Sequence, residues 1–195
     1  LYRDSDEGPW VLGDFAHSEV RLIQPSLIQN KDDSITMFLR SDHDSSRMWH
    51  SMSFDNGENW NIPRPAAIPN NNSSLDAVKL KSGMVVLVFN DSTGPRSPLS
   101  LSTAFDGDKA FESIRHIEDS HGEFSYPAII APEVDQIMVG YTHQKDSIKI
   151  ITVDPKWINE RPDRVSSNTP AKMSWDWISP YKGQSPLCLP YLDIV

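Results

Sequence analysis

The chain has 195 residues, of which 38% are hydrophobic, as in an ordinary globular chain that builds one sizeable core or part of a larger one. The formal net charge of −9, with no basic run, argues against nucleic acid as a main partner, and no stretch of about 18 apolar residues is present to span a membrane. Cys188 is the only cysteine, which excludes an internal disulfide. Because the chain begins at Leu1 without a signal-peptide pattern, we expect a fragment or processed product, and its compartment stays open.

Short apolar segments alternate with turn residues along the first third of the chain. After a polar stretch over residues 1–21, we expect strands at residues 23–28, 35–40 and 48–53. Asp32 and Asp33 mark the turn between the first two of them. The segment therefore reads as a run of short antiparallel strands.

The third of these strands leads into a corner with four diagnostic residues. Ser53, Asp55, Gly57 and Trp60 form the pattern S-x-D-x-G-x-x-W. Asp55 is placed to accept hydrogen bonds from backbone N–H groups just ahead of it, and Gly57 tolerates a positive φ. Trp60 offers a large ring to bury where the chain re-enters the sheet, so we expect it to open a fourth strand. The pattern predicts a hairpin corner with a structural role.

The same unit recurs with a period of about fifty residues. The anchors Ile28, Val78 and Ile129 lie 50 and 51 residues apart. Residues 104–111 form a degenerate copy of the corner, in which Asp106 keeps the carboxylate and Phe111 replaces the tryptophan. The further strands that we expect lie at residues 75–80, 84–90, 99–102, 125–130, 136–141 and 148–153.

A fifty-residue period with four short strands per unit predicts an all-β fold, a β-propeller with about three four-stranded blades in this chain. The expected blades span approximately residues 22–72, 73–122 and 123–157, so residues 1–157 form a partial propeller. Residues 158–195 break the rhythm and are expected to form an irregular C-terminal tail. A β-sandwich is the alternative, but it predicts neither the period nor the repeated corner.

Blade topology places the ends of second strands and the starts of first and third strands on the face opposite the corners. Arginine suits carboxylate ligands there, and tyrosine and acidic groups suit sugar contact or acid–base chemistry. Most of these residues also have a plain structural alternative: a surface ion pair for Arg40, a solvated loop charge for Arg96, exposed carboxylates for Asp76 and Glu123, packing for the tyrosines, and a turn contact for Asn90. The candidate substrate-binding residues are Arg40, Arg96, Gln24, Asp76, Asn90 and Tyr141, and the candidate catalytic residues are Tyr126 and Glu123. The histidines show no metal-ligand spacing, so we expect neither metal nor other cofactor.

These segments together resemble sialidases of the BNR-repeat class, in the bacterial and plant-like branch, over roughly residues 20–157. The corner at residues 53–60 is similar to the Asp box of that superfamily. The resemblance implies a six-bladed propeller in which an arginine triad grips the carboxylate of the substrate. A tyrosine–glutamate pair then supplies the nucleophile, and an aspartate is the acid/base. By position, Arg40 matches the second triad arginine and Arg96 the third, while the first arginine and the aspartate would lie upstream of Leu1.

Two positions depart from the pattern of that superfamily. Gln24 lies where the glutamate partner is expected, and an amide does not take a proton from tyrosine as a carboxylate does. Phe124 lies where the nucleophilic tyrosine is expected, with Tyr126 two residues on as the substitute if the strand start shifts. The resemblance implies a sialidase-like exo-glycosidase acting on terminal acidic sugars of glycans, incomplete in this chain. A non-catalytic glycan-binding or scaffolding propeller, or a truncated product without independent activity, are the alternatives. Neither the oligomeric state nor the sugar follows from the sequence.

Overall fold

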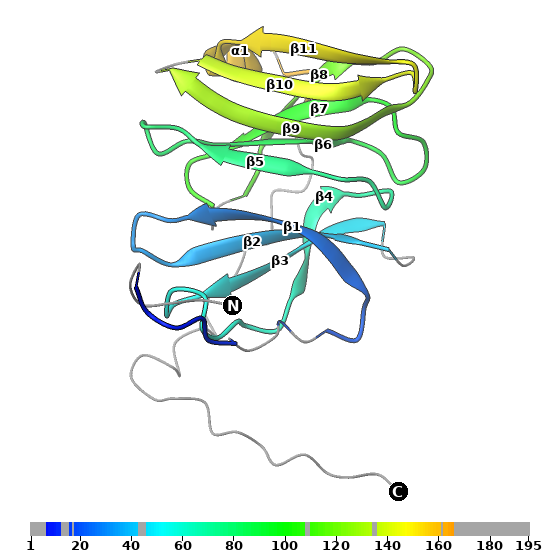
Figure 1. The fold of residues 1–195 in the computed structure, drawn as a ribbon. Coiled ribbons are helices and arrows are strands. Elements are labelled where there is room, and N and C mark those ends of the chain that lie inside the picture. Colours follow the sequence, from blue (N-terminus) through cyan, green and yellow to red (C-terminus); the bar gives the residue numbers. More distant parts are fainter. Residues whose placement is uncertain are drawn as a thin grey trace, which may run out of the picture.

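The computed structural model describes residues 7–12, 16, 18–42, 46–107, 110–133, 136–160 and 162–165. Three antiparallel sheets are stacked face to face along the molecule (Figure 1). Apart from β12, which joins the second sheet beside β8, neighbouring strands within each sheet are consecutive in the chain, so each sheet is a local unit of two or three hairpins. The elements are β1 (Leu22–Gln29), β2 (Ile35–Ser41), β3 (Arg47–Ser53), β4 (Arg64–Pro69), β5 (Asp76–Lys79), β6 (Val85–Asn90), β7 (Leu99–Ala104), β8 (Ser113–Glu118), β9 (Phe124–Glu133), β10 (Gln136–His143), β11 (Ser147–Val153), α1 (Pro155–Glu160) and β12 (Arg164–Val165).

The three sheets are the blades that the fifty-residue period predicts. Blade 1 has the order β1-β2-β3-β4, blade 2 has the order β12-β8-β7-β6-β5, and blade 3 has the order β11-β10-β9. The nine strands expected from the sequence all form, with bounds shifted by a few residues at most. The first strands β1, β5 and β9 lie next to one another, with β5 between the other two (Figure 1).

Two apolar cores separate the blades, and β6 contributes to both. Its residues alternate between the cores, with Val85, Leu87 and Phe89 packed toward blade 1 and Val86 and Val88 toward blade 3. All five are fully buried, which explains why this strand reads as a continuous apolar run without polar alternation. At about 25 cal/mol per Å² of apolar surface, burial on both faces makes blade 2 the best-stabilised part of the described chain.

Two expectations about chain boundaries are wrong. Trp60 does not open the fourth strand, because β4 begins at Arg64; the Trp60 indole instead donates a hydrogen bond to the Gly57 carbonyl oxygen at 3.1 Å, within the corner. The boundary at residue 157 falls inside α1, which Asp154 caps by accepting a hydrogen bond from the Lys156 N–H at 2.9 Å.

The segment after residue 157 is therefore partly ordered against blade 2. Ile158 is fully buried in the core between blades 2 and 3, and β12 pairs with β8. The Arg115 guanidinium stacks 3.7 Å from the Trp157 ring centroid, which joins α1 to β8. Residues 166–195 of the expected tail lie outside the described residues. Among the described residues, no helix is long and apolar enough to cross a membrane.

Candidate functional site

The corner at residues 53–60 is closed by hydrogen bonds among its own residues. The Ser53 hydroxyl accepts from the Gly57 N–H at 2.8 Å and donates to the Asp55 carboxylate at 2.8 Å. That carboxylate also accepts from the Asn59 backbone N–H at 2.8 Å. Gly57 has a φ of +93°, which L side chains rarely adopt. Ser53, Asp55 and Gly57 thus hold the turn together through contacts among themselves and with Asn59.

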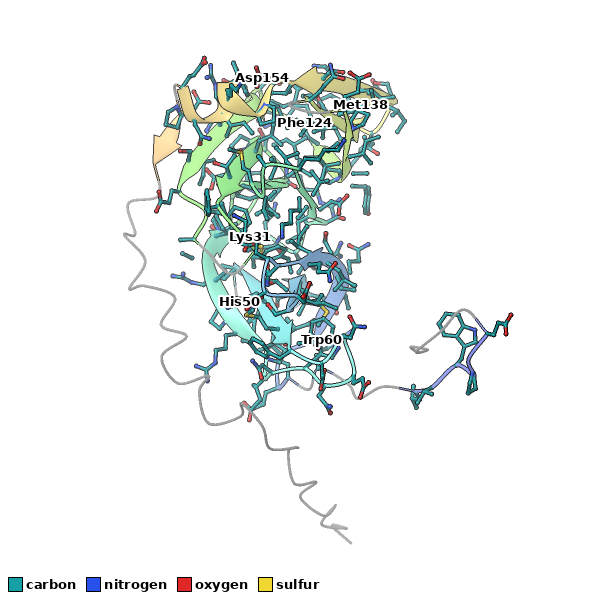
Figure 2. All side chains as sticks on the ribbon, turned by 90° about the vertical axis from the view of Figure 1, so that its left-hand side faces the viewer. Lys31, His50, Trp60, Phe124, Met138 and Asp154 are labelled. Atoms are coloured by element: carbon teal, nitrogen blue, oxygen red, sulfur yellow. The ribbon has the colours of Figure 1, made fainter. Side chains whose placement is uncertain are left out.

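The degenerate corner connects two blades. The Asp106 carboxylate, 8% exposed, accepts a hydrogen bond from the Lys31 N–H at 3.3 Å in the β1–β2 turn of blade 1. The Lys31 ammonium lies 4.2 Å from the Phe105 ring centroid, and Figure 2 shows Lys31 at the junction of the two blades. The Phe111 ring packs edge-on against Phe38 with centroids 5.6 Å apart. These contacts define the rear of the blades, where the corners and the first turns meet.

The opposite end of the blades carries two matching β-bulges. In β1 the register shifts between Ile23 and Ser26, and in β9 an equivalent shift lies opposite Tyr141. Each bulge places one non-glycine residue before a proline at positive φ, Gln24 at 51° and Tyr126 at 53°. Such positions are strained and persist where the surrounding structure holds them, often at functional sites. Both bulges direct a candidate site residue to the same end of the molecule.

Gln24 and Arg40 form the first half of this end. The Arg40 Nη1 donates to the Gln24 Oε1 at 2.6 Å, and Ile23 and Arg40 are register partners across β1 and β2. An amide is a neutral partner, so it orients the guanidinium without cancelling its charge. Arg40 therefore keeps its positive charge while Gln24 fixes the position of its guanidinium group near the end of β2.

Arg96, Glu123 and Tyr126 form the second half. The Arg96 carbonyl oxygen accepts from the Phe124 N–H at 3.0 Å, which fixes the loop before β7 against the start of β9. The Arg96 Nη1 lies 3.5 Å from the Glu123 Oε1, and its guanidinium carbon lies 5.1 Å from the Tyr126 ring centroid. The two halves together, Gln24, Arg40, Arg96, Glu123 and Tyr126, are called the mouth below.

The Tyr126 phenol connects the two halves electrostatically. Its side chain is 56% exposed, whereas Phe124 is fully buried and packs against His143 in the interior (Figure 2). A hydrogen bond from Arg96 and the charge of that guanidinium lower the pKa of Tyr126, and the Arg40 charge acts in the same direction. The bulge thus brings a reachable tyrosine hydroxyl, in place of Phe124, under the influence of both candidate arginines.

Glu123 stays ionised at the edge of the mouth. The Lys145 ammonium lies 2.7 Å from its Oε2, and the Ser125 hydroxyl donates to its Oε1 at 3.2 Å. The hydrogen bond from Lys145 is the main cause that lowers the pKa of Glu123, with Arg96 adding to it. Lys145 was not among the residues expected from the sequence. It lies in the β10–β11 turn, which belongs to the same face by blade topology, and that signal was sufficient to find it.

Two other candidates, Asp76 and Asn90, are held by protein groups. The Asp76 carboxylate accepts hydrogen bonds from Ser26, Ala77 and Ile129, so its oxygens are occupied. Asn90 is fully buried and donates to the Phe124 carbonyl oxygen at 3.0 Å, which joins β6 to β9. Both side chains therefore bond to neighbouring blades within the protein.

Tyr141 does not reach the mouth. It is 1% exposed, and its hydroxyl donates to the Glu118 Oε1 at 2.5 Å on β8. Burial raises the pKa of Tyr141 above its ordinary value, and the Glu118 carboxylate raises it further. The residue packs in the core between blades 2 and 3. No group of three or more His, Cys, Asp or Glu side chains able to hold a metal ion occurs in the part of the chain that the structure describes.

Similar solved structures are sialidases and trans-sialidases. The leech intramolecular trans-sialidase matches with a TM-score of 0.63 and 14% identity over 78% of this chain, and the Ruminococcus gnavus intramolecular trans-sialidase with 0.63 and 14% over 82%. The NanB sialidase of Streptococcus pneumoniae matches with 0.61 and 16% over 72%. The chain spans 26%, 38% and 24% of these three proteins, respectively. At such identities the likeness shows the fold, an all-β propeller of the sialidase type.

A family model extends the likeness to the sequence. The model of the BNR repeat-like domain matches residues 1–139, which include both corners and all five residues of the mouth. No curated protein sequence matches the chain. The repeat, the corners and the stacked blades agree with this match, and the chain belongs to the BNR repeat-like domain family.

Proposed function

We propose that this chain is part of a sialidase-like exo-glycosidase that hydrolyses terminal acidic sugars from glycans, with the mouth as its substrate site. The observation that supports the proposal is the contact of Arg96 with the exposed Tyr126 ring, 5.1 Å from its centroid, together with the charge of Arg40 from another blade, which acts on the same phenol. Two guanidinium groups suit a sugar carboxylate, because each offers a planar fork of N–H donors. The solved structures of similar fold carry the names of sialidases, which agrees with a substrate of this class.

In this reaction Tyr126 is the nucleophile. Its oxygen forms a bond to the anomeric carbon as the glycosidic bond breaks, and its proton passes to Glu123, which shares the Arg96 cation with it. The leaving oxygen takes up a proton from an acid that is not among the five residues of the mouth. Water then attacks the anomeric carbon and gives a proton to the acid that lost one, while the bond to the Tyr126 oxygen breaks and Glu123 returns the proton to that oxygen. The lowered pKa of Tyr126 favours the first of these steps.

A glycan-binding propeller without catalysis is the second candidate. It is favoured by Gln24, an amide in contact with Arg40 where a proton-accepting carboxylate would assist a tyrosine nucleophile. The two candidates share the arginine site and differ only in turnover, so one set of variants tests both.

The test uses the full-length protein that contains this chain, a fluorogenic α-sialoside and free N-acetylneuraminic acid as probes. Arg40→Ala and Arg96→Ala are each expected to lower kcat/KM by about 100-fold, since each removes charge-assisted hydrogen bonds to the carboxylate. Lys81→Ala, which removes an exposed cation from the β5–β6 turn at the rear, is the matched control and should leave kcat/KM unchanged.

Three outcomes separate the candidates. Release of sugar that depends on Arg40 supports the hydrolase. Binding of the free sugar that depends on Arg40, without release, supports the glycan-binding propeller. Turnover that is unchanged in Arg40→Ala contradicts the assignment of the mouth.

A further inference from the structure

The carboxylate of Asp76 joins the three blades at the depth of the two bulges. Its Oδ1 accepts from the Ser26 hydroxyl of β1 at 2.8 Å and from the Ala77 N–H of β5 at 2.9 Å. Its Oδ2 accepts from the Ile129 N–H of β9 at 3.0 Å. Asp76 begins β5, the strand that lies between β1 and β9 (Figure 1). One side chain therefore sets the spacing between the first strands of blades 1 and 3.

Both partners of Asp76 in the neighbouring blades follow a bulge directly. Ser26 is the residue at which the β1–β2 register resumes, two positions after Gln24. Ile129 follows Ala128, at which the β9–β10 register resumes after Tyr126. The carboxylate is thus bonded to the downstream end of each bulge, where the chain leaves its strained conformation.

We propose that Asp76 is a positioning residue that holds the Gln24–Arg40 half of the mouth at a fixed distance from the Arg96–Glu123–Tyr126 half. This proposal deepens the proposed function and depends on it for the identity of the ligand, though not for the geometry. Asp76 acts through the backbone of the bulges, because its two oxygens already accept three hydrogen bonds from the protein. Displacements near 1 Å at a site of this kind can cost about 100-fold in rate, so a tie between the halves has a measurable effect.

Asp76→Asn is a selective test, because an amide has one acceptor oxygen where the carboxylate has two. If that oxygen serves Ser26 and Ala77, an NH₂ group meets the Ile129 N–H; in the flipped orientation it meets the Ala77 N–H. Either way one hydrogen bond from a backbone N–H to residue 76 is lost while the volume of the side chain is kept; the Ala77 N–H has a second acceptor in the Ser26 hydroxyl at 3.1 Å, so loss of the Ile129 bond is the more disruptive case. Ser26→Ala removes the bonds that blade 1 makes to Asp76 and to the Ala77 N–H, and Ser26→Thr should restore them.

Asp106→Asn is the matched control. Asp106 is also a carboxylate that connects two blades, through the Lys31 N–H, but it lies at the rear. Both variants should lower Tm. Only Asp76→Asn and Ser26→Ala should lower the affinity of the folded protein for N-acetylneuraminic acid, by about tenfold, measured well below Tm.

A readout without ligand makes the result independent of the proposed function. Fluorotyrosine incorporated into the protein gives a fluorine NMR signal for Tyr126, assigned by its loss in Tyr126→Phe. That signal should shift in Asp76→Asn and stay in place in Asp106→Asn. If the wild type does not bind the sugar, the proposed function fails while the tyrosine signal still decides the positioning role. An unmoved Tyr126 signal in Asp76→Asn overturns the role of Asp76.

Discussion

At the rear corner the polar side chains bond within their own turn, whereas at the mouth they bond between segments far apart in the sequence. Asp55 accepts from Asn59 and Ser53, all within one turn, so this arrangement closes a hairpin and leaves little capacity for a ligand. Arg40 and Arg96 come from different blades, and each is held by one side of its guanidinium group. Polar side chains whose hydrogen bonds are all made within one turn thus indicate a role in stability. Long side chains that are fixed on one side but still accessible to a ligand indicate a role in binding.

Among the variants that test this contrast between the two ends, the largest loss of activity is expected at Tyr126. Tyr126→Phe removes the only oxygen of the side chain and keeps its contact with Arg96, so kcat for the α-sialoside should fall by about 100-fold or more while KM changes little. Steady-state kinetics measure both. Phe124→Leu, a substitution in the core behind Tyr126, serves as the control and should affect Tm more than kcat. A Tyr126→Phe protein with full kcat would remove the tyrosine from the reaction.

Arg96→Ala should change the pH dependence of the mouth. The Arg96 hydrogen bond and charge lower the pKa of Tyr126, so phenolate forms at a lower pH in the wild type than in the variant. Removing Arg96 should return the pKa of Tyr126 toward its ordinary value of 10.0 and move the alkaline titration to higher pH. Ultraviolet titration of the phenolate, with Tyr126→Phe subtracted, measures the shift. Coincident titrations of the two proteins would mean that Arg96 does not act on Tyr126.

Gln24→Glu sharpens the contrast between the two halves. Arg40 is held by a neutral amide and Arg96 by the Glu123 carboxylate, so a second carboxylate at position 24 would neutralise the remaining cation. The affinity for N-acetylneuraminic acid should fall about fivefold, from a Coulomb energy of about 1 kcal/mol at partial exposure. Calorimetry compares it with Gln24→Ala, which should be milder. Stronger binding in Gln24→Glu would contradict the idea that Arg40 binds the anion.

The smallest effect on function is expected at the rear. Asp55→Asn should lower the free energy of unfolding by about 1 kcal/mol at neutral pH and leave sugar affinity unchanged. Burial raises the pKa of Asp55, but hydrogen bonds from Asn59 and Ser53 outweigh it, so the folded-state pKa is lowered. A lowered pKa stabilises the fold above the unfolded-state value near 4 and loses that effect as pH falls through the folded-state pKa. Denaturant unfolding at two pH values should therefore show the difference between wild type and variant shrinking in acid.

The fold was largely predictable because its signals are local. The S-x-D-x-G-x-x-W pattern specified a turn whose hydrogen bonds all lie within eight residues, and the fifty-residue period repeated the same strands. One error is local, since Trp60 stays within the corner and β4 begins at Arg64. The other concerns the segment after blade 3: α1 and β12 pack on blade 2, and no local pattern at residues 155–165 reveals which blade will accept them.

The site was predictable only in part. Blade topology predicted Arg40, Arg96, Glu123 and Tyr126 at one end, because the end of a strand can be inferred from its order in the hairpin. It did not separate them from Asn90 and Tyr141, which point into the cores. Side-chain direction at a strand end depends on register, and a bulge of one residue reverses it.

The amino-acid sequence by itself determined the unit: four short strands, a corner closed by Asp55, and a repeat that carries an arginine to the end of a strand. The tertiary structure alone decided which groups meet, because the bridge through Asp76 forms only where the first strands of three blades lie side by side. The physical reason is the distance along the chain between the residues that bond. Turns are set by hydrogen bonds between residues close in the chain, whereas the bridge through Asp76 is set by hydrogen bonds to residues 50 and 53 positions away.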